Sequence, residues 1–314
     1  MVLSHVGGWH TTIRRHPPYK LAGVTVTHMD HPERWIGHAQ KDVIMAEQKV
    51  AICTGSGRHG GLGEAILSRL GQEGYRLVVT DIDGSGDHHL ANTAEMESVA
   101  EALRDQGAEV LCVPCDVRSA ESVAQLFDTI IQTFGRVDAL VNNAGIGFVM
   151  KHTRDVAPQE WQLVIDVTLS GVFLCTQAAA QHMEAAGRGG RIINIASQAA
   201  KSGFPHMAPY CAAKHGVIGL TRTAAIDYGA AGITVNAICP NHVTTGLGSA
   251  QNAYFSAFKG MTEEAYLEEM AARIPLQRIG QASDTAAMCA FLASDDASFI
   301  TGESINVSGG EEVN

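Results

Sequence analysis

Residues 49–81 read KVAICTGSGRHGGLGEAILSRLGQEGYRLVVTD, and this stretch decides the fold. A short apolar run (50–54) is followed by a glycine-rich segment (55–63), an amphipathic segment (64–74) and a second apolar run (76–81). Short continuous apolar runs are typical of buried strands, and the amphipathic segment is typical of a helix. The stretch therefore predicts a strand, a loop, a helix and a second strand.

The glycine-rich segment has two interpretations. Glycines let the backbone approach a pyrophosphate, and the amino terminus of the following helix offers free N–H groups and a positive dipole end. A tight turn alone would also use glycine.

Asp81 closes the second apolar run, 18 residues after Gly63. A carboxylate at this strand end suits the hydroxyls of an adenosine ribose and repels a 2′-phosphate, which favours NAD over NADP. Arg58 in the loop is the opposing signal, because a guanidinium could accommodate that phosphate. The position of Asp81 at a strand end is better defined, so we expect NAD.

The alternation of helix and strand continues along the chain. We expect helices near residues 92–107, 119–135 and 158–186 and another around Tyr210, with strands at 109–117, 137–145, 191–196 and 233–238. Repeated units of this kind predict an α/β fold, a doubly wound, Rossmann-like parallel sheet of about seven strands with helices on both faces. Residues 46–314 would form this single domain, after an N-terminal extension of residues 1–45.

Polar residues follow several of the predicted strands at the edge where a ligand crevice is expected. They are Asp116, Asn142, Asn143, Ser197 and the segment PNHVTT at 240–245. Singly, the asparagines could be turn residues and Asp116 a helix cap. Their joint placement favours a binding site.

Tyr210 and Lys214 lie four residues apart in a segment that favours a helix, so both would project from one face. A phenol has a pKa of about 10, and a neighbouring ammonium would bring it towards working pH. Ser197 lies at the end of the strand 191–196, where its hydroxyl can reach a substrate oxygen. Together these groups suit proton transfer to a carbonyl or from an alcohol.

Composition narrows the function classes. The 314 residues are 46% hydrophobic with a net charge of −11 and no basic cluster, which argues against a nucleic-acid partner. Seven scattered cysteines suit reduced thiols in the cytoplasm. Neither Cys112-x-x-Cys115 nor the N-terminal histidines have the spacing of a metal site. The sequence contains no uninterrupted run of eighteen apolar residues, so we expect no membrane span.

Residues 47–312 resemble a short-chain dehydrogenase/reductase of the common single-domain type. The residues that carry the resemblance are Thr54-Gly55, Gly61-Leu62-Gly63, Cys115-Asp116-Val117, Asn142-Asn143-Ala144-Gly145, Ser197, Tyr210 with Lys214, Val235-Asn236 with Pro240, Ile300-Thr301-Gly302 and Asn306 to Gly310.

The resemblance implies a homotetramer or homodimer and a catalytic set. In that set Tyr210 is the acid/base, Ser197 polarises the substrate oxygen, and Lys214 tunes the tyrosine and holds the nicotinamide ribose. Asp116 would contact the adenine. The implied contacts to NAD, or less favourably NADP, come from Gly55, Gly61, Leu62, Gly63, Asp81, Asp116, Val117, Asn143, Tyr210 and Lys214.

Three positions depart from the family pattern. The glycine loop has five residues where three are usual between Thr-Gly and Gly-x-Gly. Thr168 stands where a catalytic Asn is usual, and could keep that residue's role of holding a water in the proton relay. Asn241 and His242 stand where Pro-Gly is common, so His242 either touches cofactor or substrate or is a hydrogen-bonded loop residue.

These features predict hydride transfer between NAD(H) and a small-molecule secondary alcohol or ketone. We expect a small polyol, sugar or cyclic alcohol as substrate, under a lid formed by residues 247–278 with Tyr254, Phe255 and Phe258. Gln198, His206 and Met207 would complete the pocket.

Two alternatives remain. One is a 3-oxoacyl-thioester reductase, against which Ala231 stands where carrier-binding relatives have Arg. The other is a catalytically silent NAD-binding sensor or scaffold, which the presence of Ser197, Tyr210 and Lys214 disfavours.

Overall fold

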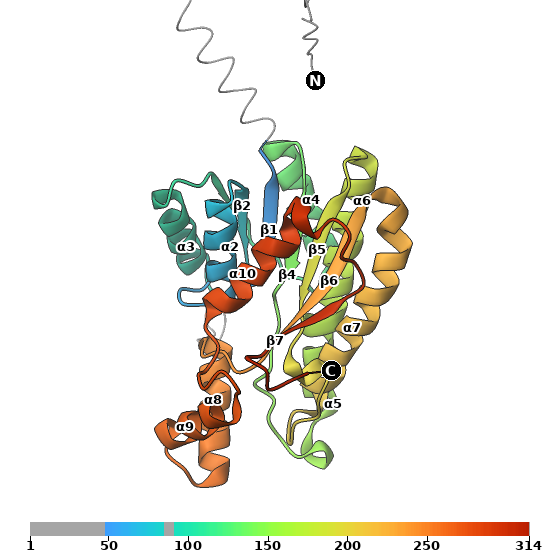
Figure 1. Cartoon of the computed structure of the whole chain (residues 1–314). Helices are drawn as coiled ribbons and strands as arrows, with labels where there is room; N and C mark the ends of the chain where they lie inside the picture. Colours follow the sequence, from blue (N-terminus) through green and yellow to red (C-terminus); the bar gives the residue numbers. More distant parts are fainter. Residues whose placement is uncertain (1–47, 85–90, 314) are drawn as a thin grey trace, which may run out of the picture. The chain divides into compact units, whose positions relative to one another are not determined.

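The computed structural model describes residues 48–84 and 91–313, so the expected N-terminal extension lies outside the described residues. Seven parallel strands form one sheet in the order β3-β2-β1-β4-β5-β6-β7 (Figure 1). The strands are β1 (Val50–Thr54), β2 (Arg76–Thr80), β3 (Val110–Cys112), β4 (Ala139–Asn142), β5 (Gly190–Ile195), β6 (Ile233–Pro240) and β7 (Ser304–Val307). The predicted doubly wound α/β fold is confirmed.

The helices connect successive strands and cover both faces of the sheet (Figure 1). They are α2 (Leu62–Gln72), α3 (Thr93–Asp105), α4 (Ala120–Phe134), α5 (Pro158–Ile165), α6 (Gly171–Ala186), α7 (Ala208–Tyr228), α8 (Gly246–Lys259), α9 (Glu263–Arg273) and α10 (Ala282–Ala293). The boundaries expected for α3 and α4 are confirmed to within two residues.

Local sequence explains where these helices begin and end. The side chains of Asn92 and Ser119 accept hydrogen bonds from backbone N–H groups three residues onward, which caps the amino termini of α3 and α4. Gly135 ends α4 and Gly187 ends α6 in the left-handed conformation that glycine adopts without a steric penalty.

The helical segment 158–186 differs from the expectation of one long regular helix. It is continuous, but the turn Asp166–Ser170 between α5 and α6 is π-helical. A π-helical turn inserts an extra residue into the helix and changes the direction of the side chains, and such turns are frequent at functional sites. Thr168, one of the predicted site residues, lies in this turn.

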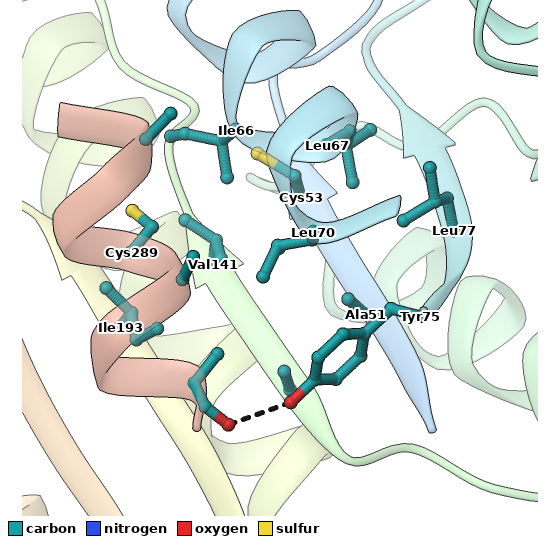
Figure 2. Packing of buried hydrophobic residues seen from close by; sticks show 14 of the residues in the cluster. Ala51, Cys53, Ile66, Leu67, Leu70, Tyr75, Leu77, Val141, Ile193 and Cys289 are labelled. Atoms are coloured by element: carbon teal, nitrogen blue, oxygen red, sulfur yellow. Dashed lines mark hydrogen bonds between the residues drawn. The ribbon is translucent and has the colours of Figure 1, made fainter. Parts of the chain in front are cut away.

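The sheet separates two apolar cores. Alternate residues of β1 point to opposite faces, so Ala51 and Cys53 pack beneath α2, α3 and α10, whereas Val50 and Ile52 pack against α4 and α6. Figure 2 shows the first core, in which Leu70 of α2 and Cys289 of α10 belong to one cluster with Val141 and Ile193 of the sheet. This two-sided burial keeps the sheet rigid beneath the ends of its strands.

Segment 158–186 is also long and apolar enough, by length and composition alone, to cross a membrane. However, 44% of its most apolar stretch is buried inside the domain. Cys175, Ala179 and Met183 of α6 belong to the second core. Packing in this core accounts for the apolar composition, and the expected absence of a membrane span stays a prediction.

The order of the strands places the site. The chain runs outward through β2 and β3 on one side of β1 and then returns to β4 on the other side. Thr54 at the end of β1 is in register with Thr80 at the end of β2, and Ile195 of β5 is in register with Ile238 of β6. The carboxyl ends of the central strands therefore meet at one edge, where the connections diverge and leave a crevice.

Removal of one buried hydroxyl should measurably weaken the first core. Tyr75 donates a hydrogen bond of 2.8 Å to the carbonyl oxygen of Ala293 at the end of α10 (Figure 2). Tyr75→Phe leaves that buried carbonyl without its partner, and should lower the free energy of unfolding by about 1–3 kcal/mol in urea denaturation.

Tyr228→Phe is the matched control, because the half-buried Tyr228 has no hydrogen bond from its hydroxyl to the described part of the chain. If both variants unfold at the same urea concentration as the natural chain, the Tyr75 bond does not stabilise the fold.

Candidate active site

The glycine loop is shaped by close backbone contacts. A β-carbon on Gly55 would lie 2.7 Å from Cα of Ala144, and one on Gly63 would lie 2.7 Å from Cα of Ser56. Gly55 also has a φ of 66°, in the left-handed region. Any larger residue at either position would displace the backbone, so these two predicted residues are glycine for a geometric reason.

Gly57 is a third crowded position, which sequence reasoning missed. A β-carbon there would lie 2.4 Å from the Met96 side chain and 2.8 Å from Cβ of Asp81. Its backbone N–H donates a 3.0 Å hydrogen bond to the Asp81 carboxylate. The G-x-G spacing of Gly55 and Gly57 is visible in the sequence. The position of Gly57 opposite Asp81 depends on the fold.

The glycine loop is two residues longer than is usual in the family, and its residues His59 and Gly60 are held in place by neighbouring helices. Glu64 in the first turn of α2 accepts hydrogen bonds from the backbone of Gly60 and from His59. The second ring nitrogen of His59 contacts the hydroxyl of Ser98 in α3 at 3.0 Å. The longer loop is therefore packed against α2 and α3.

The start of α2 suits a pyrophosphate. Gly61 is the N-cap, no side chain caps the helix there, and Leu62 is its first residue. The N–H groups of an uncapped first turn are left to bind an anion, which the helix dipole favours. With the close approach permitted at Gly55 and Gly63, these residues fit the diphosphate of a dinucleotide.

Asp81 lies at the end of β2, as the sequence predicts. Its carboxylate accepts hydrogen bonds from the backbone of Gly57 and, at 2.9 Å, of Ile82. Burial raises the pKa of this carboxyl above its ordinary value, and the two backbone bonds oppose the rise. Arg58 lies near both Asp81 and Glu95, with 4.0 Å between its Nε and a Glu95 carboxylate oxygen.

Asn143 joins the two halves of the crevice. Its side-chain amide donates hydrogen bonds of 2.9 Å to the carbonyl oxygens of Thr54 and Gly55. In return the Thr54 hydroxyl accepts bonds from the backbone of Asn143 and Ala144. Asn143 therefore fixes the glycine loop relative to β4.

Asp116 and Val117 follow β3. Both oxygens of the Asp116 carboxylate contact Arg118, the shortest contact being 2.6 Å, and this pairing lowers the pKa of Asp116 below its ordinary value. The side chain of Val117 is buried against Gly171 of α6. Asp116 is thus ionised and oriented by Arg118, while the Val117 side chain belongs to the second apolar core.

Ser197 and Tyr210 are brought together as predicted. Ser197 follows β5 by two residues, and Tyr210 lies in the first turn of α7, fully within the apolar packing. Burial raises the pKa of the Tyr210 phenol to about 12, and a hydrogen bond with Ser197 opposes the rise.

Lys214 lies one turn beyond Tyr210 but does not have the predicted effect in the chain alone. Its ammonium donates a 2.6 Å hydrogen bond to the carbonyl oxygen of Ile195 and lies 5.7 Å from the centre of the Tyr210 ring. Burial lowers the pKa of Lys214 to about 8. The expectation that Lys214 lowers the tyrosine pKa towards working pH is wrong here, because desolvation of both groups is the larger effect.

Thr168 is buried beside Lys214. Its hydroxyl accepts a 3.1 Å hydrogen bond from the backbone of Ile146. A β-carbon placed on Gly145 would lie 3.5 Å from the Lys214 ammonium and 3.7 Å from the Thr168 hydroxyl. The π-helical turn thus brings Thr168 to the place where a proton relay to the lysine is expected.

The segment after β6 is held by the carboxyl-terminal end of the chain. Glu311 accepts a short hydrogen bond from the Asn241 amide and forms a 3.2 Å ion pair with Arg273 of α9. His242 packs edge-on against Tyr266 of α9, and burial lowers its pKa. Glu311 therefore holds in place the segment in which Asn241 and His242 replace the usual Pro-Gly. No local sequence pattern could reveal this contact between Glu311 and Asn241.

The predicted lid, residues 247–278, forms α8 and α9. Phe255 of α8 packs against the cluster around Tyr210, to which the buried Met207 also belongs. Tyr254 contacts His206 instead, while Phe258 is mostly exposed. Gln198 begins a short 3-10 turn after Ser197.

The arrangement places a proton donor, a hydroxyl and an ammonium at the end of β5, beside a loop shaped for a dinucleotide. Among residues 48–84 and 91–313, no group of three or more His, Cys, Asp or Glu side chains is placed to hold a metal ion. The chemistry that these groups can perform is proton transfer to or from an oxygen next to a bound cofactor.

The family profile described as Enoyl-(Acyl carrier protein) reductase matches residues 55–312. The chain belongs to the short-chain dehydrogenase/reductase family. Its members are oxidoreductases that use a nicotinamide cofactor.

Relatives in this family cover nearly the whole domain. The 3-oxoacyl-(acyl-carrier-protein) reductase FabG of Staphylococcus aureus is 37% identical over 271 residues, which are 85% of this chain and 99% of the relative. A variant of actinorhodin polyketide ketoreductase, solved with NADPH, is 34% identical with a TM-score of 0.77, over 85% of this chain and 98% of that chain. Carveol dehydrogenase from Mycobacterium avium, solved with NAD, is 30% identical with a TM-score of 0.78, over 84% and 97%.

Lys214→Met should change how stability depends on pH. The ammonium has a pKa of about 8 in the fold and an ordinary value of 10.5. Between these values the unfolded chain binds more protons than the folded chain, so the contribution of Lys214 to stability increases as pH rises from about 8 to about 10.5. Methionine makes no such contribution.

The measurement is urea unfolding of both proteins at several pH values. The difference in unfolding free energy, natural chain minus variant, should grow across this interval, although its absolute size also reflects the lost bond to Ile195. A difference that is constant with pH would show that Lys214 titrates normally.

Proposed function

We propose that this short-chain dehydrogenase/reductase uses NAD to interconvert a cyclic secondary alcohol and the corresponding ketone. The observation that carries the proposal is the convergence of Ser197, Tyr210 and Lys214 at the end of β5, next to the glycine loop. The proposed site residues are those that the family resemblance implies.

The proposed chemistry divides between chain and cofactor. In the direction of reduction, the Ser197 hydroxyl donates a hydrogen bond to the substrate carbonyl and the Tyr210 phenol donates the proton that this oxygen takes up; alcohol oxidation reverses both steps. The bound nicotinamide supplies the hydride donor or acceptor. Lys214 stabilises the phenolate that remains after the proton has left.

The surroundings of Tyr210 support a cyclic alcohol over a polyol or sugar. Val149, Ala199 and Met207 are buried in one cluster with the Tyr210 ring, and Leu247 and Phe255 of α8 pack against it. Each hydroxyl of a polyol placed here would need its own hydrogen-bond partner, whereas an alicyclic ring gains from apolar contact. Carveol dehydrogenase, by its name, acts on an alcohol of the kind proposed.

Charge at the end of β2 supports NAD. Asp81 and Glu95 place two carboxylates around the single guanidinium of Arg58. A 2′-phosphate would meet more negative than positive charge there, whereas ribose hydroxyls can donate hydrogen bonds to Asp81.

A second candidate is reduction of a 3-oxoacyl thioester, which similarity to FabG supports. The net charge of −11 disfavours it, because an acidic carrier protein would be repelled.

We also propose a cytoplasmic homotetramer or homodimer. Free thiols at all seven cysteines suit that compartment, and the exposed Trp161 and Phe173 on α5 and α6 suit an interface.

Tyr210→Phe should lower kcat for ketone reduction by a factor of about 100 or more, the usual contribution of a general acid. NADH binding, measured by its fluorescence, should be nearly unchanged. The assay follows NADH oxidation with alicyclic ketones, aldoses and a 3-oxoacyl thioester.

Tyr228→Phe, in the last turn of the same helix α7, is the control and should keep full activity. A fully active Phe variant at position 210 would refute the mechanism. A preference for the thioester would favour the second candidate function. If the protein binds NADH but oxidises it with none of the compounds, a sensor is favoured.

Asp81→Asn should shift the preference from NADH towards NADPH by about tenfold or more in kcat/KM, because it removes one charge near the adenosine ribose. Asn keeps a carbonyl oxygen that can accept the bond from Gly57, so the loop should hold its shape. The same assay on Asp81→Ser separates loss of charge from loss of that bond. An unchanged NADH to NADPH ratio in both variants contradicts the assigned role of Asp81.

A further inference from the structure

Helix α8 approaches the catalytic tyrosine through Gln251. The side-chain nitrogen of Gln251 and the ring edge of Tyr210 both approach Gly147: each lies 3.0 Å from the position that a β-carbon on Gly147 would occupy. Gly147 therefore leaves the space in which an amide and the phenol ring approach one another.

Within the described part of the chain, the Gln251 amide makes one long hydrogen bond. Its nitrogen donates to the carbonyl oxygen of Gly147 at 3.4 Å, the upper limit of hydrogen-bond length. The other side chains packed around Tyr210, including Val149, Met207 and Phe255, are apolar. A polar group in such surroundings gains free energy from a stronger partner, and a substrate oxygen can be that partner.

A contact one helical turn further along holds α8 in this position. The hydroxyl of Tyr254 lies 2.7 Å from Nδ1 of His206, in the loop before α7. His206 has a φ of 63°, a conformation that is costly for a residue other than glycine and that persists only where surrounding contacts impose it. Residues 251 and 254 are on the same face of the helix, so the contact to His206 directs Gln251 towards Tyr210.

The neighbouring Asn252 is a second residue that restricts the position of α8. It is fully buried next to His242, in the segment after β6. The contact between Tyr254 and His206 and the burial of Asn252 beside His242 both restrict the position of α8, and with it the position of Gln251.

We propose that Gln251 is a specificity-determining residue that donates a hydrogen bond to a second oxygen of the substrate. The proposal rests on the proposed function and narrows its substrate class to a cyclic ketone or alcohol that carries a further carbonyl or hydroxyl oxygen. Tyr254 and His206 are positioning residues that act through Gln251.

The experiment measures ligand binding to the complex of enzyme and NADH in a Tyr210→Phe background, which prevents turnover. The probes are cyclohexane-1,4-dione and cyclohexanone, which share a ring and differ in the second oxygen. Kd is obtained from the change in NADH fluorescence. We expect the dione to bind about tenfold more tightly, the value of one additional neutral hydrogen bond.

Gln251→Leu keeps the size of the side chain and removes its polar atoms, so it should abolish this preference while leaving cyclohexanone binding nearly unchanged. Gln251→Glu, which cannot donate when ionised, should also lose it. Gln132→Leu on the exposed face of α4 is the matched control and should retain it.

Tyr254→Phe removes the contact to His206 and, because Tyr254 acts through Gln251, should reduce the preference for the dione while leaving cyclohexanone binding nearly unchanged. A preference for the dione that survives both Gln251 substitutions overturns the inference. The inference is also overturned if the Tyr210→Phe parent protein shows no preference for the dione. The proposed function still stands in that case if the parent protein binds cyclohexanone and the natural enzyme reduces it. Failure of the natural enzyme to reduce any ketone is the separate result that overturns the proposed function.

Discussion

Burial of the Lys214 ammonium at the carboxyl end of β5 is the constraint on which the site depends. A charge removed from water is costly unless it is hydrogen-bonded, and the 2.6 Å bond to the Ile195 carbonyl offsets part of that cost. The bond fixes the rotation of α7 relative to β5. Tyr210, one turn earlier on the same face, then has to lie beside Ser197, two residues beyond Ile195. One strand end thus positions the acid, the hydroxyl and the cation.

A dinucleotide fits next to this strand end because the sheet reverses its order between β1 and β4. The bonds from Asn143 to Thr54 and Gly55 hold the two strand ends together across the point of reversal. Crowding at Gly55 against Ala144 shows how closely the two backbones approach. The crevice is therefore a consequence of the reversal in strand order. Its shape at this point depends on Gly55, which lets the two backbones approach.

The sequence was sufficient for the fold because each strand and helix has its own local pattern of apolar residues, glycines and caps. It also placed Ser197, Tyr210 and Lys214 at one strand end, since parallel strands share their direction. The π-helical turn at Thr168, the contact of Gly57 with Met96 and the bond from Asn241 to Glu311 could not be predicted. Each depends on the meeting of segments that are distant in the chain. The raised pKa of Tyr210 could not be predicted for the same reason, because burial is a property of the whole domain.

That burial bears on the direction of the proposed reaction. A phenol with a raised pKa holds its proton until a stronger base forms beside it, and an alkoxide developing on a reduced ketone is such a base. The chain alone therefore holds Tyr210 as the protonated phenol, which is the form that donates a proton in reduction. Alcohol oxidation needs a phenolate at working pH, and an additional positive charge is required to stabilise one in these apolar surroundings. Burial lowers the pKa of Lys214 to about 8, so this ammonium supplies less of that charge as the pH rises through this value.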